Sequence, residues 1–452
     1  MYRIDPSTES HQEFSPSVQM AALHELLTDE EIETICRQLG HTWRDRIFSP
    51  AVTVRSLVYR RLHPDKSIRA VLADMTAGDD QLTDVPADAS WCEARCRLPA
   101  PLWQQLIDRS AARLQKLAGK KYRYRARPVF LADGSTVSMP DTADLEEAFG
   151  YANTKHGMSR FPVARITFLT RAGTEAVVDY RLDPYRTAED AQFRAMWDRL
   201  PAGCICLCDR KFGSFYNLAK LQQQGVDVLC PLHQRRDPKK LIAAGRKLGR
   251  NEWLVWLDLA PQLRKKYEDP SLPERLCVRL IRLTFDHDGQ RKELWLVTTL
   301  LDRDRYSRAS LARLYRRRWG IETRIGSLKT TLEMNVLPSK TEKGVRYDVA
   351  ATILAHNLVW TIIHQAAAKT ETPADRISFT GAVQTILAYS NRLRYASACE
   401  RRAIYHEMLR NIASHTNPHR PGRSEPRLVK RDQRRYGFLK LPRRFAREKC
   451  LS

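Results

Sequence analysis

Residues 204–230 read CICLCDRKFGSFYNLAKLQQQGVDVLC, and the fold class follows from their pattern. An apolar run at 204–208 precedes a segment with helical spacing at about 215–224, and a second apolar run follows at 226–230. Short apolar runs separated by a helix are typical of neighbouring strands in an α/β sheet. The segment therefore predicts a strand, a helix and a second strand.

Further strand-like segments precede this unit. A basic linker at about residue 120 runs into a short apolar stretch that ends near Asp133, and VARITFLT (163–170) and EAVVDYRL (175–182) follow it. A helix is expected around 188–200. Three strands in succession, followed by strand–helix alternation, predict an α/β fold whose first strands are antiparallel.

The alternation stops after residue 230. Strand-like segments at 252–260, 276–285 and 292–301 predict a β-rich insertion over 231–302, with the turn residues DHDGQ between the last two. A long helix at about 308–334 follows. Further helices are expected at about 345–368, 377–396 and 399–413.

The first 120 residues predict an all-α domain. Apolar residues at spacings of three and four mark Met20–Arg37, Pro50–Met75 and Pro101–Leu117 as helical. The acid-rich turn Thr28 to Glu31 is expected to begin a second helix within the first of these segments.

Charge is distributed unevenly over the 452 residues. The chain has 76 Lys and Arg against 52 Asp and Glu, a net charge of +24. Residues 1–120 hold 15 basic and 17 acidic side chains, so residues 121–452 carry +26. Such an excess favours a nucleic-acid partner, because like charges repel one another unless a polyanion is bound; a solvated basic face is the alternative.

The last 33 residues extend this charge pattern. Residues 420–452 contain 12 basic and 3 acidic side chains, three prolines and no sustained helical spacing. They predict an extended tail that binds polyphosphate.

Composition also narrows the cellular context. The longest apolar stretch, 349–368, is interrupted by polar residues and is expected to be a buried helix, so no membrane partner is predicted. No secretory signal is visible at the start, which predicts a cytoplasmic location and reduced cysteines.

The expected helix 308–334 carries a group of reactive side chains. Tyr315, Arg318, Glu322 and Lys329 fall within roughly 60° of arc at about 100° per residue. A carboxylate beside two cations and a phenol suits metal binding next to a phosphate. The alternative is an ordinary surface Arg–Glu pair at i, i+4.

Two aspartates strengthen the first interpretation. Asp133 and Asp209 each come at the end of an apolar strand, where a charge is costly unless it is partnered. Each alone is typical of a residue that opens a turn. Together with Glu322 they would bind two hard divalent cations, a site that stabilises the attacking and leaving oxygens in phosphoryl displacement.

These motifs resemble a known family. LYRRRWGIETRIGSLK (314–329) matches without a gap the Tyr-x2-Arg-x3-Glu-x6-Lys signature of bacterial insertion-sequence transposases of the "insertion element four" type. LADGSTVSMPDT (131–142) and CLCDRKFGSF (206–215) are similar to the first and second Asp motifs of that family, and EPRLVKRDQRRYGFLKLPR (425–443) to its basic C-terminal motif. The resemblance covers about residues 20–445.

The resemblance implies a DDE transposase, with an RNase H-like catalytic core interrupted by the β-rich insertion. It implies that Asp133, Asp209 and Glu322 form the catalytic, metal-binding triad for two Mg²⁺ or Mn²⁺ ions. The DNA contacts that it implies are Tyr315, Arg318, Lys329, Arg210 and Trp295, the last by stacking on a flipped base. For Trp295 a strand-core role is the alternative.

The implied activity is cut-and-paste DNA transposition. A homodimer would cleave element ends at terminal inverted repeats, open the second strand through hairpin ends, and join the ends to target DNA. One departure stands out: VLCPLHQRR (228–236) has Pro231 where several relatives present an arginine, so Arg235 or Arg236 substitutes for it or the contact is absent.

The expected organisation has five parts. They are an all-α DNA-binding domain (1–120), the first part of the core (121–230), the β-rich insertion (231–302), the second part of the core with the catalytic helix (303–345), and a helical C-terminal region with the basic tail (346–452).

Other functions are less well supported. The cysteine spacings do not match a zinc site, and no phosphate-binding loop indicates a nucleotide cofactor. A catalytically silent DNA-binding regulator and a nuclease without strand transfer are the rival functions. The intact acid triad argues against the regulator, and the Tyr, Arg and Lys phosphate contacts argue against the nuclease.

Overall fold

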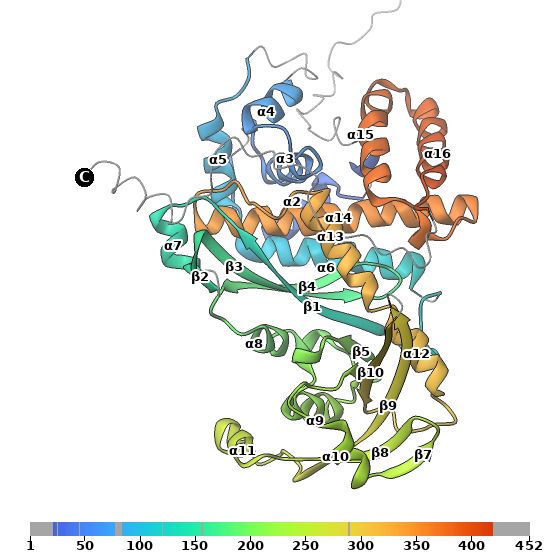
Figure 1. Ribbon diagram of the computed structural model, residues 1–452. Coiled ribbons are helices and arrows are strands. Elements are labelled where there is room, and N and C mark those ends of the chain that lie inside the picture. The colour runs from blue at the N-terminus through green and yellow to red at the C-terminus, as the bar shows by residue number, and fades with distance from the viewer. Residues whose placement is uncertain are drawn as a thin grey trace, which may run out of the picture. The chain divides into compact units, whose positions relative to one another are not determined.

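The computed structural model describes residues 21–418 except 25, 45, 77–83, 120, 155–156 and 288–289. The chain forms two compact units (Figure 1). The first joins residues 1–106 to 347–416, and the second contains 107–346. The contacts thus group two segments that the sequence assigned to separate domains, while the predicted functional boundaries stay predictions. The basic tail lies outside the described residues.

The first unit is helical. Its elements, some of which extend into the second unit, are α1 (Ala21–His24), α2 (Asp29–Gln38), α3 (Pro50–Leu62), α4 (Ile68–Thr76), α5 (Asp88–Arg97), α6 (Ala100–Ala118), α14 (Glu342–Thr370), η4 (Ala374–Arg376), α15 (Phe379–Tyr395) and α16 (Ala398–Ser414). The expected start of α2 is confirmed, because the Thr28 hydroxyl accepts a hydrogen bond from the Glu31 amide at 3.2 Å.

The helical stretch predicted over Pro50–Met75 is wrong as a single element. The structure has two helices there, and α3 ends at Leu62 with His63 as its C-cap. Pro64 follows directly, and a proline disfavours the helical conformation of the residue before it. The chain therefore turns before α4 begins at Ile68.

Helix α14 is held in the first unit by a buried charge cluster. Asp348 is fully buried, and guanidinium nitrogens of Arg60, Arg61 and Arg95 lie 3.8–4.0 Å from its Oδ1. Arg60 and Arg61 come from α3, and Arg95 comes from α5. One carboxylate therefore links three helices through three cations.

The second unit is built on a ten-stranded sheet. Its strands are β1 (Val129–Ser138), β2 (Tyr151–Thr154), β3 (Gly157–Arg171), β4 (Val177–Pro184), β5 (Ile205–Cys208), β6 (Asp227–Pro231), β7 (Arg246–Gly249), β8 (Glu252–Asp258), β9 (Arg275–His287) and β10 (Gln290–Thr298). Their order is β2-β3-β1-β5-β6-β10-β9-β8-β7, with β4 paired to β3. Only β1–β5 and β5–β6 are parallel pairs among the described strands.

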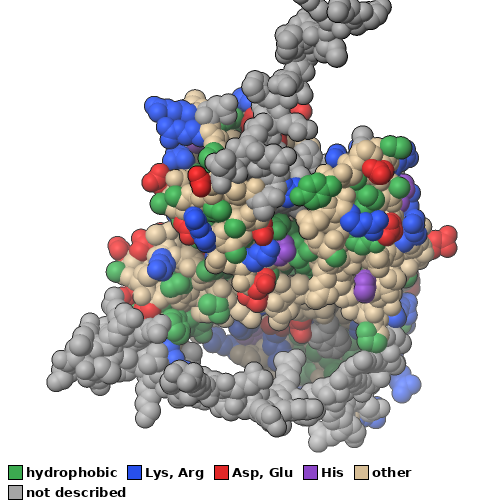
Figure 2. All heavy atoms as spheres, turned by 90° about the horizontal axis from the view of Figure 1, so that it is seen from above, with side chains coloured by type: hydrophobic (Ala, Val, Ile, Leu, Met, Phe, Trp, Pro, Cys, Tyr) green, Lys and Arg blue, Asp and Glu red, His purple; other side chains and the backbone are tan. Residues whose placement is uncertain are grey.

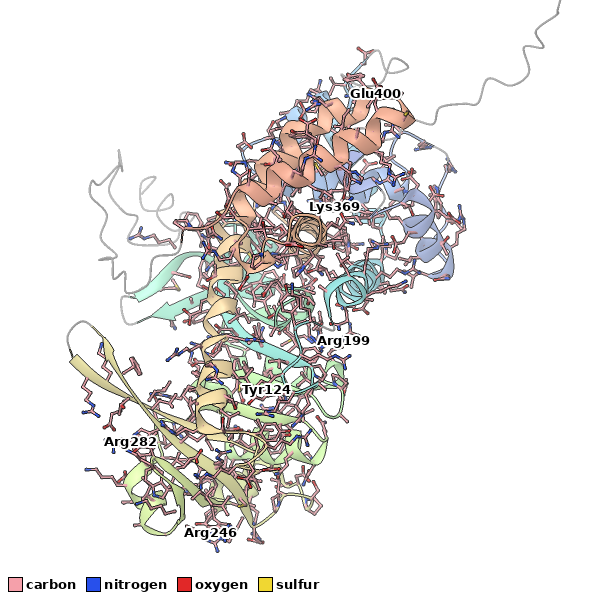
Figure 3. The ribbon with its side chains drawn as sticks, turned by 90° about the vertical axis from the view of Figure 1, so that its right-hand side faces the viewer. Tyr124, Arg199, Arg246, Arg282, Lys369 and Glu400 are labelled. Atoms are coloured by element: carbon pink, nitrogen blue, oxygen red, sulfur yellow. The ribbon has the colours of Figure 1, made fainter. Side chains whose placement is uncertain are left out.

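The β-rich segment after residue 231 continues this sheet. Strand β10 pairs antiparallel with β6, with Leu296 opposite Pro231, and β9, β8 and β7 follow outward. Strands β9 and β10 form a long hairpin, on which Figure 3 labels Arg282. The predicted strands are therefore confirmed, and they extend the main sheet.

The second unit also contains helices, several of which pack against this sheet. They are α7 (Ala143–Phe149), α8 (Glu189–Arg194), η2 (Trp197–Arg199), η3 (Arg210–Phe212), α9 (Phe215–Gln223), α10 (Pro238–Ala243), α11 (Pro261–Tyr267), α12 (Arg308–Arg316) and α13 (Trp319–Thr330). Helix α8 packs on β3 and β4, α9 on β6, and α13 on β1. Alternate residues of β5, Cys206 and Cys208, join the apolar cluster beneath α8 and α9.

The continuous helix predicted over 308–334 is wrong. It is divided into α12 and α13. The amides of Arg317, Arg318, Gly320 and Ile321 donate to carbonyls three residues back, at 2.9–3.0 Å, so the backbone tightens between the two helices. Arg318 lies within this turn and its side chain pairs with two carboxylates, which accounts locally for the distortion.

Surface charge is mixed on the face shown in Figure 2. Lys and Arg side chains lie there between acidic and apolar ones. Within the described residues, no helix, α14 included, has both the length and the apolar content needed to cross a membrane.

Candidate active site

Asp133 and Asp209 come together because β1 and β5 are parallel neighbours. The register pairs Ala132 of β1 with Cys208 of β5, and each aspartate is the next residue of its chain. Both are half-buried. Asp209 directly follows β5, whereas Asp133 lies within β1, which continues to Ser138, so the expected position at a strand end holds for Asp209 alone. The parallel register puts the two carboxylates at the same edge of this part of the sheet.

Helix α13 brings the third acid to this edge. Glu322 is in its first turn, and one oxygen of its exposed carboxylate accepts a hydrogen bond from Arg318 at 2.9 Å. The Arg318 guanidinium also lies 3.6 Å from the Asp133 Oδ2 atom, and the side chain is 10% exposed. Arg318 therefore connects the first and third acids, which is more than the surface i, i+4 pair of the alternative interpretation.

Asp133 is in an unfavourable position for a charge. Its pKa is raised to about 6, mainly by burial and also by the neighbouring Asp209 and Glu322 charges, against the lowering effects of the Gly134 amide and Arg318. The Gly134 amide donates to Asp133 Oδ1 at 2.8 Å. The carboxylates influence one another electrostatically, which a bound cation would relieve.

The two other signature residues lie beside the acids. Tyr315 is buried, its ring lies 5.7 Å from the Arg318 guanidinium carbon, and burial raises its pKa. Lys329 donates to the Ser135 hydroxyl on β1 at 3.1 Å, and partial burial lowers its pKa. The helix break does not separate Tyr315 from Arg318.

The donor set fits a divalent metal ion. Carboxylate oxygens are what Mg²⁺ and Mn²⁺ prefer, and burial together with the neighbouring carboxylates makes the charge on Asp133 costly without a cation. Across the part of the chain that the structure describes, no three His, Cys, Asp or Glu side chains converge closely enough to hold a metal as they stand. Arg318 is the cation that Asp133 and Glu322 share here.

Sequence reasoning missed a fourth acid at this edge. Glu189, the first residue of α8, pairs with Arg165 at 3.3 Å and with Lys211 at 3.0 Å. A Cβ placed on Gly134 would come within 2.7 Å of the Glu189 carboxylate, which makes glycine the residue that fits after Asp133. An acid at the start of a predicted helix was the available signal.

Arg210 lies in a second basic group. It is exposed on η3, and its charge, with those of Arg235 and Arg236, lowers the pKa of His233 in addition to the effect of burial. Both arginines of the VLCPLHQRR segment are therefore electrostatically close to His233, as Arg210 is. Their contact with DNA stays a prediction.

Trp295 has protein contacts on its ring. It is half-buried, with the Trp253 ring 5.7 Å away and the Arg282 guanidinium 5.6 Å from its centroid. It also packs against the apolar cluster below the sheet. These contacts support the strand-core alternative, and stacking on a DNA base stays a prediction.

The matching family model is described as a transposase DDE domain. It matches residues 124–358, which include the three acids, the signature residues and the strands of the sheet. The chain belongs to this family. Its members' name refers to two aspartates and a glutamate, the residue types found at the edge described above.

Individual relatives agree with this family. The chain is 24% identical over 307 residues to the transposase InsG for insertion sequence element IS4 of Escherichia coli (strain K12), covering 66% of each protein. It is 31% identical over 100 residues to the putative transposase InsZ of the same organism, covering 22% of this chain and 33% of that protein. A solved structure, the piggyBac transposase synaptic complex with hairpin DNA, is similar with a TM-score of 0.45 at 11% identity, covering 90% of this chain and 87% of that one.

Proposed function

We propose that this family member is a DNA transposase that cleaves element ends at terminal inverted repeats and joins them to target DNA. One observation carries the proposal: the parallel register of β1 and β5 places Asp133 beside Asp209, and Arg318 links Asp133 to Glu322. Carboxylates so arranged beside cations suit phosphodiester chemistry.

The proposed roles follow from position. Asp133, Asp209 and Glu322 would hold two Mg²⁺ or Mn²⁺ ions, which when bound activate water and stabilise charge on the reacting phosphate. Arg318, Tyr315 and Lys329 would bind the backbone phosphate at the element end, and Arg318 would exchange its carboxylates for that phosphate. Arg210 and Trp295 are proposed as further DNA contacts.

The strand order supports an RNase H-like core. If the strands β1, β3, β4, β5 and β6 are numbered one to five in chain order, their order in the sheet is 3-2-1-4-5. The β1–β5 pair, at the proposed catalytic edge, is parallel. The proposal includes a homodimer that bridges two ends, hairpin opening of the second strand, an N-terminal DNA-binding domain and a cytoplasmic location. These parts rest on the family resemblance and on charge.

Cleavage of DNA carrying the inverted repeats that flank the coding sequence tests the proposal. Glu322→Gln should lose Mg²⁺-dependent cleavage by about 10²- to 10⁴-fold, the equivalent of several kcal/mol, while end binding is retained. Glu342→Gln is the matched control, because Glu342 also pairs with an arginine four residues away and is similarly exposed.

Three outcomes separate the candidate functions. Cleavage by Glu322→Gln at the wild-type rate would remove Glu322 from the chemistry. End binding by the wild-type protein without cleavage at any Mg²⁺ or Mn²⁺ concentration would identify a silent regulator. Cleavage without joining to target DNA would identify a nuclease.

A further inference from the structure

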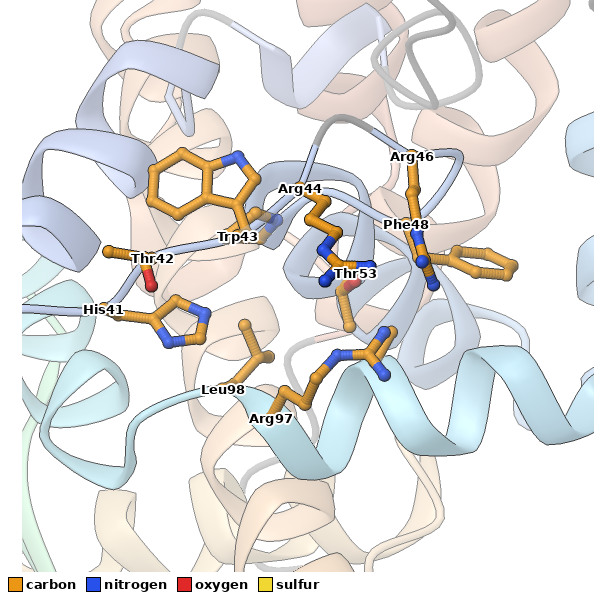
Figure 4. A pocket seen from close by; sticks show the side chains of 11 residues that line it. His41, Thr42, Trp43, Arg44, Arg46, Phe48, Thr53, Arg97 and Leu98 are labelled. Carbon is orange, nitrogen blue, oxygen red and sulfur yellow. The ribbon is translucent and has the colours of Figure 1, made fainter.

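A pocket in the first unit contains none of the proposed catalytic residues. Its volume is about 370 Å³, and it lies between the segment 41–48, the start of α3 and the end of α5. Figure 4 shows the Arg44 and Arg97 guanidinium groups directed at the space in front of Thr53. Trp43 and His41 lie at one end of this space, and Phe48 lies beside Arg46 at the other.

The pocket is strongly basic. Arg44, Arg46 and Arg97 line it, and none of the described residues that line it is acidic. Arg97 has an exposed partner, Glu93, at 3.7 Å. Arg44 and Arg46 have no ion-pair partner among the described residues. Pro50 and Thr53 belong to the first turn of the 13-residue helix α3, whose N-terminus adds partial positive charge.

Aromatic rings occupy the same pocket. The rings of His41 and Trp43 are 5.9 Å apart with an interplanar angle of 24°, and the Arg37 guanidinium lies 5.3 Å from the Trp43 centroid. Burial and the Arg97 charge lower the pKa of His41, which keeps its ring neutral at pH 7. Trp43 is half-buried and lines the pocket, so its flat apolar ring is partly accessible to a ligand there.

We propose that this pocket binds an unstacked nucleotide of DNA, with its base on Trp43 and neighbouring phosphates on Arg44, Arg46 and Arg97. The volume lies near the lower end of the range of about 300–1,000 Å³ for small-ligand sites, so it admits one nucleotide and excludes a duplex. Three arginines exceed the need of one phosphate, which favours a nucleotide within a strand over a free one. The inference goes beyond the proposed function, because nucleotide binding in this pocket requires neither a metal ion nor DNA cleavage.

The test is oligonucleotide binding by the full-length protein in EDTA, measured by fluorescence anisotropy. Two labelled 12-mers are compared, one of thymidine and one with abasic sites at its centre. Stacking of one base should give the wild-type protein a preference of about 5- to 150-fold for the thymidine strand. Phosphate contacts elsewhere on the protein, such as those predicted for the basic tail, would act on both strands alike, so the ratio isolates the base.

Substitutions assign the preference to the pocket. Trp43→Leu should bring the ratio close to 1, while Trp43→Phe, which keeps a ring, should retain most of it. Arg97→Ser should weaken binding of both strands and reduce the salt slope by about 0.7, leaving the ratio unchanged. Arg402→Ser, an exposed arginine of α16, is the matched control and should leave the ratio unchanged.

Each outcome decides the proposal. A wild-type preference retained in Trp43→Leu, with wild-type melting, would overturn it, and so would equal binding of both strands by the wild-type protein. Competition by free dTMP as effective per nucleotide as the 12-mer would identify a free nucleotide as the ligand. Glu322→Gln should keep the preference for the thymidine strand. Failure of the catalytic proposal would therefore not affect the outcome of this test.

Discussion

Asp133 is half-buried and Asp348 is fully buried, and the net charge of the groups around them differs in sign. Asp133 has one arginine near it and two further carboxylates, and its pKa is raised to about 6. Asp348 has three arginines within 4.0 Å and no hydrogen bond partner for either oxygen among the described residues. Carboxylates outnumber arginines around Asp133, as expected of a site that binds a cation. Arginines outnumber carboxylates around Asp348, where the charges serve packing.

The largest effect is expected at the packing site. Asp348→Asn leaves three buried cations without their counter-ion, so the free energy of unfolding should fall by about 3 to 5 kcal/mol. Urea unfolding of the full chain measures the change. Asp375→Asn, at an exposed position of η4, is the control, and equal stability of both variants would show that the cluster contributes nothing.

A change of the opposite sign in the free energy of unfolding is expected at Asp133, in the proposed catalytic site. Asp133→Asn should stabilise the metal-free protein at pH 7 by up to about 3 kcal/mol, because ionising Asp133 costs more in the folded chain, where its pKa is about 6, than in the unfolded chain. The free energy of unfolding of the wild-type protein should fall as pH rises from about 4 to 6, because Asp133 ionises over that range. The variant lacks this carboxyl and should not show this fall. Thermal melting across that range, in EDTA, would contradict the idea if the two curves ran parallel.

Metal binding should follow the same ionisation. A divalent ion requires the deprotonated carboxylate, so Mn²⁺ affinity should fall about tenfold per pH unit below pH 6 and level off above it. Isothermal titration calorimetry measures the affinity. A plateau that extends unchanged down to pH 4.5 would remove Asp133 from the metal site.

A smaller change is expected from Arg318, the cation that Asp133 and Glu322 share. The Arg318 charge lowers the pKa of Asp133, so Arg318→Gln should move the bend in the Mn²⁺ affinity profile to higher pH, by roughly one unit or about 1.4 kcal/mol. Lys329→Gln is the comparison, because Lys329 bonds Ser135 and neither acid. If the bend stays at the same pH in Arg318→Gln, the ion pair between Arg318 and Asp133 at 3.6 Å does not stabilise the carboxylate.

The smallest effect closes the comparison. Arg60→Met removes one of three cations around Asp348 and leaves two, so the free energy of unfolding should fall by about 1 kcal/mol or less. A loss as large as that of Asp348→Asn would show that all three arginines are needed to neutralise the carboxylate.

The residues proposed for catalysis could be selected from the sequence, whereas the packing around them could not. Strand ends and a helical face were enough to select Asp133, Asp209 and Glu322, because apolar runs report strands and charges at their ends are costly. The break between α12 and α13 was missed, since one of the two acids that hold the Arg318 side chain within it, Asp133, is distant in sequence. Glu189 and the pocket beside Trp43 were missed for a related reason: α8 is short, and segment 41–48 has no periodic pattern.

The Asp348 cluster has a consequence for folding during synthesis on the ribosome. Arg60, Arg61 and Arg95 are made first, and their counter-ion emerges about 250 residues later. At about 5 to 20 residues per second, the nascent N-terminal helices wait roughly 13 to 50 s with three cations that they cannot yet bury. The first unit is therefore expected to complete its core only after the whole sheet of the second unit has been translated, which ties its maturation to that of the catalytic residues.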